Sequence, residues 1–74
     1  MTASEFLAAF AEEVGGPIPT TDEFDALLEL AAVAAHGSER VAAPLACWIA
    51  GVTGRPVSEL IAGARRVLGA DGAV

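Results

Sequence analysis

Glycine and proline divide this chain into four apolar stretches, and this division constrains the fold more than any other feature. The dividing residues are Gly15, Gly16, Pro17, Gly37, Gly54 and Pro56. Within each stretch, apolar residues recur every three or four positions, which is the period of a helix that buries one face. No stretch alternates apolar and polar residues in the manner of a β-strand. The sequence therefore predicts an all-α fold, a single domain formed by a small bundle of about four short helices.

The first two helices have the same start signal. Thr2 followed by Glu5, and Thr20 followed by Glu23, have the spacing of a capping box. At the other end of the second helix, Gly37 is suited to a left-handed C-cap. We expect helices at about residues 3–14, 21–36, 41–53 and 56–68, with residues 70–74 as a frayed tail.

Helical spacing also predicts which side chains face the core. The expected core-facing residues are Phe6, Leu7, Phe10 and Val14; Phe24, Leu27, Leu28, Ala31, Ala34 and Ala35; Leu45, Trp48, Ile49 and Val52; and Leu60, Ile61, Ala64, Val67 and Leu68. The second set is wide, which indicates that this helix packs on more than one neighbour. The third lies in the longest uncharged stretch, residues 41–54, and predicts a buried, central helix.

The length of the chain limits its stability. A chain of 74 residues buries only about 60% of the surface that it exposes when unfolded. Such domains retain about 3 to 5 kcal/mol unless a disulfide, a metal or a partner supports them. Cys47 is the single cysteine, and His36 and Cys47 are too few for a zinc site. We therefore predict no metal and no cofactor, and association remains as the available support.

Charge and hydropathy exclude several classes of partner. The chain carries ten acidic residues against four basic ones, all arginine, and its net charge of −6 disfavours nucleic-acid binding. Residues 41–54 contain Pro44 and are shorter than the roughly 20 residues that cross a bilayer, which disfavours a membrane span. The N-terminus has no signal-peptide pattern, and a single thiol suits a reducing compartment. We expect an acidic cytoplasmic protein.

The best candidate interaction site lies at the junction of the second and third helices. His36, Glu39, Arg40 and Pro44 gather there within a few positions. His36 and Arg40 either present cationic donors to an anionic group of a partner, or have structural roles, with His36 capping its helix and Arg40 paired with Glu39 or an acid of the second helix. We favour the structural alternative.

Trp48 completes the candidate interaction residues. It is either the largest filler of a small core or an anchor for a partner, and we favour the core. We predict that Cys47 is a small buried apolar residue and not an activated thiolate. Ser38, His36 and Glu39 lie too close together in the sequence for a hydrolytic triad, and no nucleophile elbow surrounds the serine. We predict no catalytic residue.

The same junction carries residues that resemble a known family. They are Leu27 to Ala31, Ala34 to His36, Glu39, Arg40, Ala42 to Leu45 and Gly51. Together they resemble a small actinobacterial domain of uncharacterised function, found alone or joined to molybdenum-cofactor guanylyltransferase, the enzyme that makes molybdopterin guanine dinucleotide. The resemblance covers roughly residues 5–54 and implies an accessory helical module near that enzyme. The enzyme's own nucleotide loop has no counterpart here, because neither glycine cluster follows a strand or carries a lysine.

Three functions follow in order of support. The first is a non-enzymatic accessory or binding module that uses residues 36–48 to dock on a partner, such as the guanylyltransferase or a related protein. The alternative is a self-associating structural protein that forms a homodimer. A small-molecule enzyme is the least supported, because one histidine and no lysine, tyrosine, asparagine or glutamine can hardly build a polar pocket.

Overall fold

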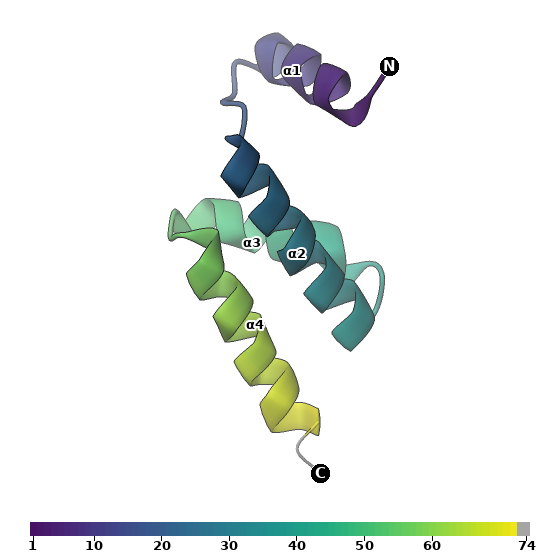
Figure 1. Ribbon diagram of the computed structural model, residues 1–74, viewed down its shortest axis with the longest axis vertical. Coiled ribbons are helices and arrows are strands. Elements are labelled where there is room, and N and C mark those ends of the chain that lie inside the picture. Colours follow the sequence, from purple (N-terminus) through teal and green to yellow (C-terminus); the bar gives the residue numbers. More distant parts are fainter. Residues whose placement is uncertain (73–74) are drawn as a thin grey trace.

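The computed structural model describes residues 1–72, and this part of the chain forms four α-helices and no strand (Figure 1). They are α1 (Ala3–Val14), α2 (Thr21–Gly37), α3 (Ala42–Thr53) and α4 (Val57–Gly72). The predicted all-α fold is confirmed. Each helix begins within one residue of the position expected from its start signal.

Both predicted capping boxes are present. The backbone N–H of Glu5 donates to the Thr2 hydroxyl at 3.1 Å, and the N–H of Thr2 donates to the Glu5 carboxylate at 2.7 Å. Thr20 and Glu23 repeat this pair of bonds at 3.1 and 2.8 Å. Each box satisfies amides that the first helical turn leaves free, so α1 and α2 start where local chemistry dictates.

Glycine ends two of the helices in the left-handed conformation. Gly15 after α1 has φ 71° and Gly54 after α3 has φ 70°. The left-handed cap predicted at Gly37 is wrong, because Gly37 is the last residue of α2 and Ser38 caps the helix through its N–H and its hydroxyl, which both donate to the Ala34 carbonyl. Gly37 instead allows a close approach of α4, since a Cβ at this position would overlap the side chain of Leu68 and Leu68 would have to move.

Helix α4 continues beyond its predicted end at residue 68. It passes through Gly69 and ends at Gly72, so the frayed tail predicted for residues 70–74 is wrong for 70–72, and residues 73–74 lie outside the described part. A glycine inside a helix costs only about 1 kcal/mol relative to alanine. The half-buried Leu68, seated against Gly37, ties the preceding turn to α2.

Helix α2 is the centre of the fold, since α3 and α4 both pack against it, α3 crossing behind it and α4 running beside it (Figure 1). The core joins Leu30 of α2, Ala50 of α3 and Ile61 of α4. The expectation that α2 serves more than one neighbour is confirmed, whereas the prediction that the third helix is central is wrong. Helix α2 has apolar residues around much of its circumference, so it can contact two helices. Helix α3 presents mainly small side chains to α2.

Helix α1 stands apart from this three-helix core. It lies at one end of the long axis, beyond the extended connector that precedes α2 (Figure 1). The molecule measures 46 × 23 × 18 Å, and its radius of gyration of 13.5 Å exceeds the roughly 11 Å of a compact chain of this length. Leu7 is half-buried and Ala11 is buried, whereas the predicted core residues Phe6, Phe10 and Val14 are exposed.

The core face of α2 also differs from the predicted one. Leu30 is 3% exposed and was not among the expected residues, whereas the expected Leu28 is 58% exposed. On α4, Ile61 is buried as expected but Val67 is 69% exposed. A helix with apolar residues on several sides has no single face set by its own sequence, and its neighbours decide which side is buried.

Candidate interaction surface

Helix α3 has large apolar side chains on the side that faces solvent. We call this surface the α3 outer face; it consists of Val41, Leu45, Trp48, Ile49 and Val52. Each of these residues retains more than half of its accessible surface, and Trp48 is 67% exposed. The sequence grouped four of them correctly as one stripe, but the prediction that the stripe is buried is wrong.

Small side chains explain why α3 packs on α2 with its alanine-rich side and leaves its bulky side in solvent. Its inner side presents Ala46, Cys47 and Ala50 to the core residues of α2 and α4. Alanines let helix axes approach closely, so α3 packs tightly on α2 with little side-chain volume between them. Bulky residues on the opposite side are then left without a neighbour in this chain.

Local chemistry fixes the ends of α3. Pro44 lies in the first turn, where its missing N–H removes no helical bond, as the sequence predicted. Val41 precedes the helix in a helical conformation without a side-chain cap, and Gly54 ends it. Between Ala42 and Thr53 there is no charged residue, so the outer face is bounded by charges only beyond the helix ends.

The predicted interaction residues are all exposed; Trp48 belongs to this face, and the other four lie close to it in the sequence. His36 is in the last turn of α2, Glu39 and Arg40 form the turn before α3, and Pro44 and Trp48 lie on α3. Among the side chains of residues 1–69, no hydrogen bond or ion pair joins His36, Glu39 or Arg40 to another group. The favoured structural roles, a capping histidine and an Arg40 ion pair, are therefore not what the structure has.

The ion pair of the described residues lies elsewhere. Arg65 of α4 contacts Glu29 of α2 at 3.5 Å, and both side chains are more than half exposed. Exposed pairs of this kind contribute about 0 to 1 kcal/mol because water and salt screen them. It is a weak link between α2 and α4.

Cys47 belongs to the core side of α3. Its Sγ lies 3.8 Å from the carbonyl oxygen of Leu27, to which the thiol donates. Burial raises the pKa of the Cys47 thiol, which disfavours the nucleophilic thiolate. The structural interpretation of this cysteine agrees with its position.

The other candidate chemical groups are dispersed. The Ser38 hydroxyl donates to the Ala34 carbonyl at 2.7 Å, where it serves as a cap. Among the side chains that the structure describes, those of residues 1–69, no three of His, Cys, Asp or Glu gather where they could hold a metal ion. No helix in this part of the chain has the length and apolarity needed to cross a membrane.

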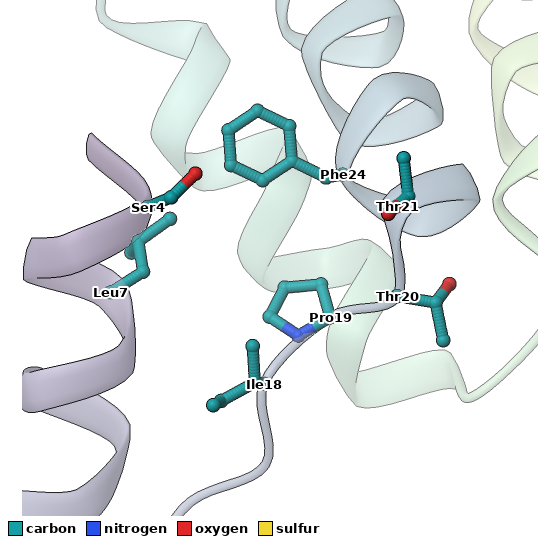
Figure 2. Close-up of a pocket in the computed structure, with 7 residues that line it drawn as sticks. All are labelled: Ser4, Leu7, Ile18, Pro19, Thr20, Thr21 and Phe24. Carbon is teal, nitrogen blue, oxygen red and sulfur yellow. The ribbon is translucent and has the colours of Figure 1, made fainter. Parts of the chain in front are cut away.

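A cleft that the sequence did not reveal lies between α1 and the start of α2 (Figure 2). Its lining residues are Ser4, Leu7, Ile18, Pro19, Thr20, Thr21 and Phe24. The cleft has a volume of about 180 Å³, below the roughly 300 to 1,000 Å³ of ligand pockets, and no charged side chain lines it. Thr20 already accepts a bond from the backbone N–H of Glu23, and Leu7 of α1 and Phe24 of α2 both line the cleft (Figure 2).

A comparison with protein families places this geometry in context. A model described as a domain of unknown function, DUF6457, matches residues 1–72. The chain belongs to the DUF6457 family. No curated protein and no solved structure matches it. The DUF6457 match spans all four helices, so α1 belongs to the family domain although it packs little on the other three.

Proposed function

We propose that this DUF6457 domain is a non-enzymatic binding module that docks on a partner protein through the α3 outer face. The observation that supports this proposal is the set of five large apolar side chains that α3 directs toward water. Burial of apolar surface contributes about 25 cal/mol per Å², and such a set on one helix is a strong source of association energy. Trp48, at the middle of the set, is the type of residue that most often anchors an interface.

Polar groups around the face support the same use. Interfaces combine an apolar centre with a polar rim, and here Glu39 and Arg40 at one end of α3 and Arg55 at the other surround an uncharged centre. His36 lies next to this rim at the end of α2. Of the interaction residues predicted from the sequence, most thus lie in the polar rim of the proposed interface, and Trp48 lies at its apolar centre.

The partner that we propose is a molybdenum-cofactor guanylyltransferase or a related protein. This part of the proposal comes from the resemblance carried by residues 27–51 and not from the geometry. The module would be an accessory to molybdopterin guanine dinucleotide synthesis without transferring the nucleotide itself. A cytoplasmic location belongs to the same proposal, since a single free thiol suits a reducing compartment.

The chemistry available in the chain supports a role without catalysis. The thiol faces the core with a raised pKa, the Ser38 hydroxyl is engaged in a cap, and the cleft beside α1 is small and uncharged. Catalysis needs a nucleophile or an acid–base group positioned beside a substrate site. None of these three features combines a reactive group with a substrate site.

Affinity measurements with matched variants test the proposal. The guanylyltransferase would be co-expressed with the full chain, and binding of purified proteins measured by calorimetry. Because truncation of an anchoring tryptophan costs about 2 kcal/mol or more, Trp48→Ala should weaken binding about thirtyfold. Val52→Ser and Val67→Ser form a matched pair, since these valines are 66% and 69% exposed on different helices. Only Val52→Ser should weaken binding.

Two outcomes would contradict this proposal. One is the absence of any complex between the two proteins, and the other is a complex whose affinity Trp48→Ala and Val52→Ser leave unchanged. Arg40→Ala tests the rim separately and should have a smaller effect that salt reduces. Turnover of a substrate by the purified chain, abolished by His36→Ala, would favour an enzyme instead.

A further inference from the structure

We propose that, when no other protein covers it, the α3 outer face pairs with a second copy of this chain about a twofold axis. This inference rests on the proposed function, because it uses the same docking surface and names its occupant in the free protein. The partner protein would then compete with self-association for Trp48 and its neighbours.

Surface area is the first argument. A compact protein of 7.4 kDa exposes about 4,200 Å², whereas this chain exposes 5587 Å². The surplus of about 1,400 Å² exceeds the roughly 800 Å² that each protein contributes to a standard interface. Helix α1 and the α3 outer face both contribute to it. A single copy therefore exposes more surface than a compact chain of its size, and the α3 outer face is a part of that surface with several large apolar side chains.

The thin core of one copy is the second argument. In the described residues, the buried hydrophobic side chains are Ala11, Leu30, Ala50 and Ile61, and two of these are alanines. A domain this small generally needs a disulfide, a metal or another subunit. The single cysteine cannot form a bridge within the chain, and the described residues contain no metal-holding cluster. A second copy is always available where the chain is synthesised, and it would supply the missing apolar contacts.

Charge favours self-pairing at this face over the other surfaces. Two copies with a net charge of −6 repel each other, and a twofold interface brings like residues near each other. Most of the acidic residues lie on α1 and α2, whereas α3 has none from Ala42 to Thr53. The α3 outer face is thus a large apolar surface on which two copies can meet without bringing carboxylates together.

The spacing of the face fits an antiparallel helix pair. Val41, Leu45, Trp48 and Val52 follow at intervals of four, three and four residues, which is the a/d spacing of a helix-pairing seam. In the antiparallel orientation, Val41 meets Val52 of the second copy and Leu45 meets its Trp48. The start of one α3, with Glu39, then lies beside the end of the other, with Arg55. Each end of the seam then holds one carboxylate, Glu39, between its neighbour Arg40 and Arg55 of the other copy.

Sedimentation equilibrium of the full chain over a wide concentration range tests this inference. The wild-type mass should rise from 7.4 kDa toward twice that value with concentration. Val52→Asp should raise the dissociation constant at least tenfold, whereas Val67→Asp, at an equally exposed position on α4, should leave it unchanged. The emission of Trp48, the single tryptophan, should shift to the red on dilution of the wild type and be red-shifted throughout in Val52→Asp.

Three results would overturn the inference: a wild-type chain that is monomeric at every concentration, a Val52→Asp variant that associates like the wild type, or equal weakening by Val67→Asp. Circular dichroism shows whether each variant keeps its helices. A monomer that binds the guanylyltransferase through Trp48 would refute self-pairing and leave the proposed function intact. A dimer that Val52→Asp dissociates, but that binds no guanylyltransferase, would refute the proposed partner and support self-pairing.

Discussion

Replacing Gly37 by alanine tests the contact that joins the ends of α2 and α4. A methyl group at Gly37 would overlap the Leu68 side chain at its Cδ1, Cδ2 and Cγ atoms, so Leu68 must move. Overpacking of this kind costs about 1 to 3 kcal/mol, and the higher helix propensity of alanine offsets up to about 1 kcal/mol. Because the overlapping atoms are the end of a half-buried side chain that can move, the cost lies at the lower end, and we expect Gly37→Ala to destabilise the protein by up to about 2 kcal/mol.

Gly51 provides the matched control. It lies inside α3, and a methyl group built on it meets no atom within 4 Å. Gly51→Ala should therefore stabilise the protein by about 0.5 to 1 kcal/mol through helix propensity alone. The same chemical change thus has opposite signs at the two positions.

Urea unfolding at one fixed protein concentration, followed by circular dichroism, measures both effects. A double-mutant cycle with Leu68→Ala isolates the contact, because Gly37→Ala should lose its cost once the leucine side chain is removed. Stabilisation by Gly37→Ala equal to that by Gly51→Ala would refute the packing of α4 on the end of α2. Additive effects of Gly37→Ala and Leu68→Ala would refute it as well.

Three further predictions concern the core and the titratable groups. Leu30→Ala should cost about 2 to 5 kcal/mol in urea unfolding, whereas Leu28→Ala, at an exposed position, should stay within about 0.5 kcal/mol. Hydrogen bonds with the backbone and then the side chain of Thr2 lower the pKa of Glu5, so the cap of α1 is present at neutral pH and lost as pH falls through the acidic range. The protection factors of the amides at the start of α1, which compare the measured exchange with the intrinsic rate at each pH, should fall there, and Glu5→Gln should remove this dependence. Burial raises the pKa of Cys47, so stability should fall as pH rises through the range where the unfolded thiol ionises, and Cys47→Ala should flatten that decline in alkaline urea titrations.

The arrangement of α3 has a consequence for how the domain is used. Small residues face inward and bulky ones face outward, so each copy loses apolar burial that its own composition would allow. Another protein or a second copy recovers this burial only by covering the α3 outer face. Any protein or second copy that covered this face would also raise the resistance of the domain to unfolding, because it would bind the folded state alone.

The candidate site was only partly predictable. The sequence grouped Trp48 with Leu45, Ile49 and Val52, because their helical spacing is a local property, but it favoured Trp48 as a core residue over an anchor for a partner. Whether that stripe faces α2 or water was not predictable, since Ala46 and Ala50 on the other side offer an equally continuous, smaller apolar face. A rule that favours the larger face for the core gives the wrong answer here.

The amino-acid sequence by itself determined the helices and nearly all of their ends. Capping boxes at Thr2 and Thr20, and left-handed glycines at 15 and 54, act within one turn of the backbone and need no partner from elsewhere in the chain. Tertiary structure alone decided that α2 is central, that Leu30 and not Leu28 is buried, and that Trp48 faces solvent. A side chain is buried only if a neighbouring helix covers it. When a helix is apolar on several sides, more than one packing arrangement is open to it, and these arrangements are distinguished by contacts between residues far apart in the chain.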